Sequence, residues 1–245
     1  MFLIPAYRVR MATGLYLLIS VQAMAAQTAA SGGISLSQTR VVFVSTDKAQ
    51  TLAVKNTGNQ SYLIQSRVQQ TPDDTTLAPF VVTPPLFPLK PDSKQLLRII
   101  PQGSTLLTDR ESLFYLAVLA IPAQASNDPP QAQISMGVRF IIKLFYRPAN
   151  LKMSPSKAIC NLRLSQTANG VRIENPTPYF QTLGHLKLNM ASINLDAQPS
   201  MLAPMSGQNY SIRERVTKAE WQTVTDYGGL STPCQQTVSS TQETP

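Results

Sequence analysis

Few side chains of this sequence have the types and spacing that catalysis needs. His185 is the only histidine, and a lone histidine in a β-like run more often packs or faces solvent than catalyses. Asp109 and Glu111 offer two carboxylates, but two acids close in sequence are weak support for a glycosidase pair. The sequence contains no G-x-S-x-G, H-E-x-x-H or G-x-x-x-x-G-K-[ST] motif, so it lacks the usual signatures of hydrolases, zinc proteases and nucleotide-binding loops. We therefore expect no enzyme, no catalytic residue, no metal site and no cofactor.

The two cysteines, Cys160 and Cys234, are the other reactive side chains. In an oxidising compartment such a pair more often forms a disulfide than a metal or redox site. The absence of a C-x-x-C motif also disfavours a thiol-exchange enzyme. A bond between the two would close a long loop and stabilise the fold by about 4 kcal/mol in the chain-entropy description. The sequence alone leaves open whether they are bonded.

The first 25 residues have the three parts of a secretory signal peptide. Arg8 and Arg10 form a basic start, residues 14–21 are apolar, and residues 23–25 supply a small-x-small cleavage site. The apolar run is shorter than the roughly 20 residues that a membrane-spanning helix needs, which makes a retained anchor the less favoured alternative. We expect residues 1–25 to be removed and the mature protein to be soluble in an oxidising compartment, without membrane insertion.

Composition indicates a folded protein with a mildly basic surface. The chain has 43% hydrophobic and 14% charged residues, which argues for packed cores and against disorder. Removal of residues 1–25 takes away two arginines and no acid, so the formal charge falls from +8 to +6. The remaining cations are scattered, without the basic tract and interleaved aromatic residues of nucleic-acid sites. We therefore expect no nucleic-acid partner.

Short β-like runs separated by turns follow from Ile34 onward. Runs such as "ISLSQTRVVFV" and "FVVTPPLFPL" are each interpreted as one strand, and about seven strands in this region match an immunoglobulin-like sandwich. A second, shorter set of β-like runs begins after a joint at residues 148–155. The sequence thus predicts an all-β protein with two immunoglobulin-like β-sandwich domains, at residues 26–148 and 149–245.

A long apolar stripe closes the first set of strands. Every second residue from Ile134 to Leu144 is apolar, so in a strand these side chains share one face. Lys143 falls on the opposite face. The commonest meaning of such alternation is a core-facing strand, but the stripe is unusually long for that role alone.

Six fragments together resemble the periplasmic chaperones of the chaperone–usher pathway, the PapD-like proteins that assemble pili. They occur in the family's order and extend over both predicted domains: "SQTRVVF", "VVTPPLFPLKPDSKQLLRI", "DRESLFYLAVLAIP", "IIKLFYRP", "RIENPTPYF" and "TDYGG". The resemblance implies two immunoglobulin-like domains in a boomerang arrangement with a cleft between them. It also implies a turn at residues 83–85, with a cis proline. The short connection before Ile134 resembles the subclass tied to rod-like pili.

The resemblance also assigns roles to particular residues. It implies that Ile134, Met136 and Val138, with Phe140 as a fourth, are donor-strand residues that fill the groove of an incomplete pilus subunit. The other apolar residues of the stripe, Ile142 and Leu144, are interpreted as core.

The same family pattern gives Arg40 and Lys143 the role of an anchor for the subunit's C-terminal carboxylate. It gives Glu111, Arg147 and Asp226 the role of a buried charge network that sets the angle between the domains. In the family a disulfide often occurs where Cys160 and Cys234 lie.

The function implied is that of an ATP-independent periplasmic chaperone. It would bind, fold and cap pilus or fimbrial subunits by donor-strand complementation and deliver them to an outer-membrane usher. A free apolar edge could also be capped by self-association. The alternative is a secreted β-sandwich adhesin or a pilus subunit, which two apparently complete sets of strands disfavour.

Overall fold

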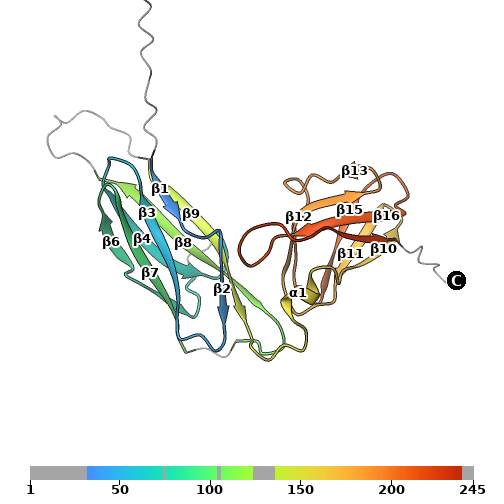
Figure 1. Cartoon of the computed structure of the whole chain (residues 1–245), viewed down its shortest axis with the longest axis horizontal. Coiled ribbons are helices and arrows are strands. Elements are labelled where there is room, and N and C mark those ends of the chain that lie inside the picture. The colour runs from blue at the N-terminus through green and yellow to red at the C-terminus, as the bar shows by residue number, and fades with distance from the viewer. Residues whose placement is uncertain (1–31, 74–75, 104–105, 124–135, 239–245) are drawn as a thin grey trace, which may run out of the picture. The chain divides into compact units, whose positions relative to one another are not determined.

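A computed structural model describes residues 32–73, 76–103, 106–123 and 136–238 of the chain. Residues 1–31, which include the predicted signal peptide, and Ile134 lie outside this range. Nearly all regular structure is β-sheet, and α1 (Pro155–Ala158) is a single helical turn (Figure 1). No helix in the described residues has the length and apolar character needed to cross a membrane.

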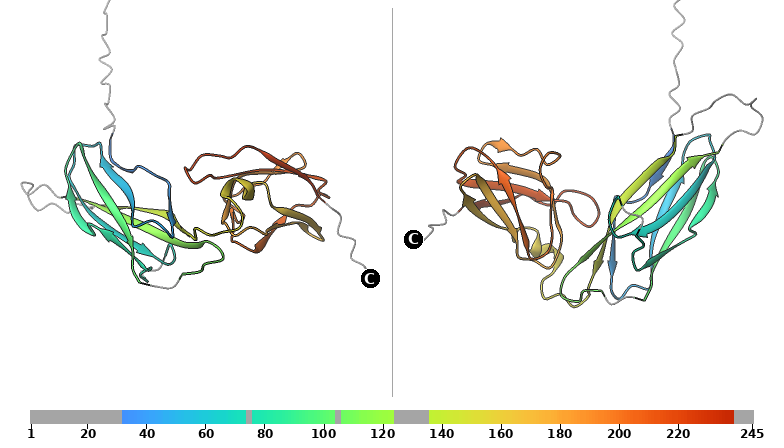
Figure 2. Two further views of the ribbon diagram at one scale, coloured as in Figure 1. Left: turned by 60° about the horizontal axis from the view of Figure 1, so that its bottom comes forward. Right: turned by 180° about the vertical axis from the view of Figure 1, so that it is seen from behind.

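The N-terminal part is a sandwich of two sheets (Figures 1 and 2). One sheet has the order β1-β3-β7-β5 and the other β2-β9-β8-β4-β6. The strands are β1 (Ile34–Leu36), β2 (Arg40–Val44), β3 (Gln50–Asn56), β4 (Tyr62–Gln69), β5 (Phe80–Thr83), β6 (Leu86–Leu89), β7 (Ser93–Pro101), β8 (Ser112–Pro122) and β9 (Val138–Arg147).

Alternation of apolar and polar residues explains how these strands form the sandwich. In β2 the side chains of Val41 and Phe43 are buried, and in β7 those of Leu97 and Ile99 are, while their neighbours are more exposed. One face of each sheet therefore carries the apolar side chains, and the two faces pack together. The largest fully buried residues of this core are Phe43, Leu52, Ile64, Leu97, Ile99, Leu116 and Leu144.

The C-terminal part is a second sandwich with its own core around Trp221 and Tyr210. Its sheets have the orders β10-β11-β15 and β13-β12-β16-β17, with β14 beside β12. Cys160 and Cys234 form a disulfide, with their Cα atoms 5.4 Å apart. The strands are β10 (Arg163–Thr167), β11 (Gly170–Asn175), β12 (Gln181–Leu188), β13 (Ala191–Ser192), β14 (Met201–Leu202), β15 (Ser206–Ser211), β16 (Lys218–Thr223) and β17 (Cys234–Thr237).

The predicted all-β fold with two sandwiches is confirmed, but two runs interpreted as single strands are each divided. The run from Ile34 to Val44 changes sheets, because β1 pairs with β3 whereas β2 pairs with β9. The run from Phe80 to Leu89 is interrupted at the Thr83–Pro84 peptide bond, which is cis as expected. A strand ends where a proline interrupts the hydrogen-bonded ladder, and it also ends where the chain crosses to the other sheet. In neither case does the alternation of apolar residues change, so the sequence pattern does not reveal the break.

Candidate functional site: the edge of β9

Strand β9 has one fully paired edge and one that is paired over only half its length. Its first edge pairs with β8 from Val138 to Tyr146. Its second edge pairs with β2, in parallel, only from Lys143 to Arg147. Between Val138 and Ile142 this second edge has no strand partner among the described residues. An unpaired strand edge is a template for the addition of another strand.

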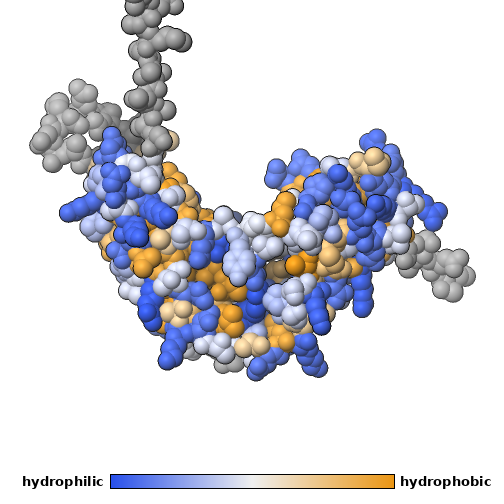
Figure 3. All heavy atoms as spheres, viewed as in Figure 1, coloured by the Kyte–Doolittle hydropathy of each residue, from blue (hydrophilic) through white to orange (hydrophobic). Residues whose placement is uncertain are grey.

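The apolar stripe on β9 passes gradually from the core to the surface. Leu144 is 0% exposed, and Phe140 and Ile142 pack partly buried against the N-terminal core. Val138 is 52% exposed, and Met136, just before the strand, is 78% exposed. Apolar surface is visible where β9 begins (Figure 3). The exposed end of the stripe, Met136 and Val138, thus lies where the unpaired stretch of the edge begins.

Two cations lie side by side where the unpaired edge ends. Arg40, the first residue of β2, is the register partner of Lys143 in β9. The Arg40 guanidinium lies 5.8 Å from the ring centroid of Phe145, and its Nη1 donates to the carbonyl oxygen of Val224 over 3.4 Å. Its Nε is buried and has no hydrogen-bond partner within the described residues.

Neither of these cations has a carboxylate partner in the part of the chain that the structure describes. The ion pairs among the described residues involve Arg110, Arg147 and Arg172, not Arg40 or Lys143. Each of the two is about half-buried, and two like charges that are close together disfavour each other's ionisation. The site therefore favours the arrival of an anion that can accept several hydrogen bonds.

The pKa values of the pair reflect this environment. Burial, followed by the charge of Arg40, lowers the pKa of Lys143 below its ordinary value. Burial also lowers the pKa of Arg40, although the charge of Asp226 opposes that shift. A carboxylate bound between them would accept charge-assisted hydrogen bonds, which are among the strongest in proteins.

Glu111, Arg147 and Asp226 form a continuous charge network. Arg147 Nε donates to Glu111 Oε1 over 2.7 Å, and its two Nη atoms donate to the Asp226 carboxylate over 2.7 and 2.8 Å. The second oxygen of Glu111 accepts from the backbone N–H of Phe180 over 2.8 Å. The Arg147 guanidinium also lies 5.1 Å from the ring centroid of Tyr179. The network thus joins β9 to residues of the C-terminal sandwich.

Burial within the network is uneven. Glu111 is 3% exposed, and this burial raises the pKa of its carboxyl above the ordinary value despite the opposing charge of Arg147. Burial disfavours the charge of Arg147 as well, but hydrogen bonds to Asp226 and Glu111 outweigh it, so the pKa of Arg147 lies above its ordinary value. The side chain of Asp226 is 42% exposed. Glu111 consequently depends on Arg147 far more than Asp226 does.

We expect Arg147→Met to lower the free energy of unfolding by about 3–5 kcal/mol, because Glu111 would remain buried without a compensating charge. Asp226→Asn should cost about 1 kcal/mol or less, since its side chain is partly solvated. Urea denaturation at pH 7 measures both. Arg172→Met is the matched control, because its ion pair with Glu174 is exposed. Equal losses for Arg147→Met and Asp226→Asn would contradict the uneven burial.

The "TDYGG" segment lies close to the residue that precedes β2. Gly228 has a φ of +86°, which non-glycine residues rarely adopt. A Cβ atom at this position would also collide with the hydroxyl of Thr39, the residue before Arg40. The glycine therefore allows the segment that carries Val224 and Asp226 to reach the cations and the charge network.

The remaining sequence candidates lie apart from this site. Asp109 is exposed and pairs with its neighbour Arg110, and His185 lies in β12 opposite Gln222. No group of metal-ligating side chains is found in the part of the chain that the structure describes. Sequence reasoning missed Phe145, Phe180 and the carbonyl of Val224. The only sequence signal for Phe145 and Phe180 is that they lie in runs with clustered aromatic residues, "KLFY" and "PTPYF".

Two protein-family models match the chain. The model of the pili and flagellar-assembly chaperone PapD N-terminal domain matches residues 33–152. The model of the pili assembly chaperone PapD C-terminal domain matches residues 157–235. Together they include β9, the cation pair and all three members of the charge network.

Individual relatives agree with these models. The probable fimbrial chaperone protein ElfD of Escherichia coli K12 is 35% identical over 213 residues, covering 86% of this chain and 89% of ElfD. The chaperone protein FimC of the same strain is 33% identical over 217 residues, covering 87% and 88%. A chain of the Salmonella enterica complex between the SafA pilin and the SafB chaperone superimposes with a TM-score of 0.75 at 30% identity, covering 84% and 96%. The periplasmic chaperone SfaE gives a TM-score of 0.69 at 33% identity, covering 83% and 98%.

Proposed function

Because the chain belongs to the PapD-like family of pilus-assembly chaperones, we propose that it lends the unpaired edge of β9 to a pilus subunit. The subunit would gain a strand that it lacks, and the exposed side chains of Met136 and Val138 would enter its apolar groove. Ile134, which precedes them in the same alternation, would enter as well. Phe140, half-buried in the free protein, would extend the contact toward the core.

The observation that carries this proposal is the coincidence of three features on β9. The edge is unpaired from Val138 to Ile142, the stripe is exposed at Met136 and Val138 where this edge begins, and two cations without a carboxylate partner in the described residues stand at its end. A strand that ends in a free carboxylate would satisfy all three features together.

Arg40 and Lys143 would hold the subunit's terminal carboxylate and thereby set the register of the added strand. If the last residue lies at Lys143 and the strand extends back toward Val138, it must run parallel to β9. A shift by one residue would turn every donor side chain to the wrong face. The anchor would therefore select one alignment as well as add binding energy.

The wider activity proposed is that of a chaperone without catalysis or use of ATP. After removal of residues 1–25 it would act in the periplasm and deliver subunits to an outer-membrane usher. The Glu111–Arg147–Asp226 network would act structurally, by restraining the link between the sandwiches. In support, similar proteins carry names of fimbrial chaperones, and one matched structure is a pilin–chaperone complex.

A secreted adhesin or a pilus subunit is the less favoured alternative, because relatives over more than four fifths of the chain are named chaperones. A pull-down of the tagged protein from the periplasm of its native host tests the proposal. We expect it to recover a small β-rich subunit in a one-to-one complex. Recovery of no partner while pili are being made, or aggregation of the protein when expressed alone, would contradict the proposal.

A further inference from the structure

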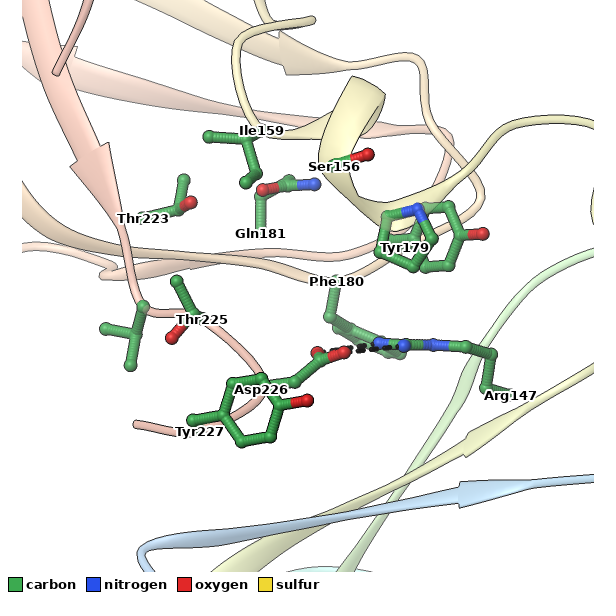
Figure 4. Close-up of a pocket in the computed structure, with 12 residues that line it drawn as sticks. Arg147, Ser156, Ile159, Tyr179, Phe180, Gln181, Thr223, Thr225, Asp226 and Tyr227 are labelled. Carbon is green, nitrogen blue, oxygen red and sulfur yellow. Dashed lines mark hydrogen bonds and ion pairs between the residues drawn. The ribbon is translucent and has the colours of Figure 1, made fainter. Parts of the chain in front are cut away.

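We propose that a cavity in the C-terminal sandwich receives a tyrosine side chain of the bound subunit. This inference rests on the proposed function, because it names a second contact for the same partner. The cavity has a volume of about 270 Å³ and lies among α1, the start of β12 and the segment that follows β16 (Figure 4). A volume of about 150 Å³ is enough for benzene, so an aromatic ring fits with room for its substituents.

The walls of the cavity are mainly apolar, but two polar side chains face it without partners. Ile159, Phe180 and Val224 supply apolar surface. Gln181 is 5% exposed, and its side-chain amide makes no hydrogen bond within the described residues. The hydroxyl of Thr223, in a residue that is 2% exposed, likewise has no hydrogen-bond partner there. Figure 4 shows the Gln181 amide beside Ile159 and Ser156.

The Gln181 amide lines the open cavity without a hydrogen-bond partner among the described residues, so a ligand that carries a hydroxyl or N–H group can bond to it there. The ligand should therefore be apolar over most of its surface and carry one hydroxyl or N–H group. A tyrosine ring has this combination and loses little conformational freedom on binding.

A charged ligand fits the cavity less well. Arg147 and Asp226 line its rim, but they are paired with each other through two hydrogen bonds. Neither charge is therefore available to a new ion without breaking this pair. The lining thus presents a neutral pair beside one exposed aromatic residue, Tyr227, which is 99% exposed.

The place of the cavity points to the subunit as the source of the ring. Val224 lines the cavity and its carbonyl oxygen accepts from Arg40, so the cavity adjoins the cation pair that would hold the subunit's end. The stretches of this chain outside the described residues do not offer another aromatic ring for the cavity. The stretches outside the described residues that follow the predicted signal peptide, 26–31, 74–75, 104–105, 124–135 and 239–245, contain no aromatic residue.

The cavity's chemistry can be tested with p-cresol, the side chain of tyrosine as a free molecule, and with toluene, which lacks the hydroxyl. NMR titration of the purified protein should show p-cresol shifting the amide signals of Ile159, Gln181 and residues 223–225. Gln181→Leu should weaken p-cresol binding about three- to tenfold, as expected for a neutral hydrogen bond, and leave toluene binding unchanged. Equal weakening of both ligands, or shifts elsewhere only, would overturn the assignment of the amide.

The identity of the occupant can be tested with the subunit complex. Ser156 is exposed at the cavity, so Ser156→Trp should fill the cavity without unfolding the protein. It should weaken the complex about tenfold and abolish p-cresol binding. Ser192→Trp, at an exposed position in β13, is the matched control.

The complex should also fail to bind p-cresol. If the complex binds p-cresol as well as the free protein does, or if only a self-associated form of the chaperone excludes p-cresol, the subunit is not the occupant. If the wild-type protein forms no complex with any subunit, the proposed function fails, while the p-cresol titration still decides the chemistry of the cavity.

Discussion

Lys143→Ala is expected to weaken the subunit complex by about 10- to 100-fold while the chaperone remains folded. A hydrogen bond to a charged group contributes about 1.5–3 kcal/mol, and each 1.4 kcal/mol corresponds to a tenfold change in affinity. The subunit carboxylate would also be left with Arg40 as its only cation. Titration calorimetry with the recovered subunit measures the change. Lys152→Ala, at an exposed position beyond β9, is the control and should leave the affinity unchanged.

We expect the free chaperone to become more stable when the positive charge of Lys143 is removed. Burial, followed by repulsion from Arg40, lowers the pKa of Lys143. A lowered lysine pKa means that the charged form is less favourable in the folded than in the unfolded protein, so it costs stability at every pH where Lys143 is protonated. We expect Lys143→Met to have a melting temperature at or above that of the wild type at pH 7. A binding loss accompanied by a large fall in melting temperature would instead indicate a structural role.

Val138→Asp should have an effect at least as large, a loss of about 100-fold or more in affinity for the subunit. In the free protein Val138 is 52% exposed, so a carboxylate there remains hydrated and stability should change little. In the complex the same carboxylate would enter an apolar groove without a partner, where an unpaired charge is strongly disfavoured. Titration calorimetry measures the loss of affinity for the subunit, and thermal unfolding of the free variant measures any change in stability.

The control for Val138→Asp is Met190→Asp, which changes an even more exposed apolar residue in the C-terminal sandwich. It should leave subunit binding unchanged. If Val138→Asp binds the subunit as well as the wild type does, the donor strand does not include this residue. If both variants lose binding equally, the loss reflects net charge rather than the groove.

Much of the fold could be predicted from the sequence because its signals are local. Apolar alternation identified the faces of β2, β7 and β9, and turn residues separated most strands. The division of residues 34–44 into β1 and β2 could not be predicted, because both halves alternate alike and only their distant partners differ. The place where β2 begins decides how much of β9 is left unpaired, and this depends on pairing far along the chain.

The site was predicted less completely, for the same physical reason. Arg40 and Lys143 are two ordinary cations in the sequence, and only the parallel pairing of β2 with β9 makes them neighbours. Their proximity was expected from the family resemblance, not from local pattern. The cavity beside Gln181 had no sequence signal, because its walls come from segments that lie far apart in the chain.

Backbone hydrogen exchange in β9, measured in the free chaperone and in the subunit complex, tests the central claim most directly. The account predicts that amides facing the unpaired edge between Val138 and Ile142 exchange fast in the free protein and become at least about 100-fold slower in the complex. Amides of Lys143–Arg147 that face β2 should be protected in both states. A complex that leaves exchange between Val138 and Ile142 unchanged would contradict the claim that this edge is lent to the subunit.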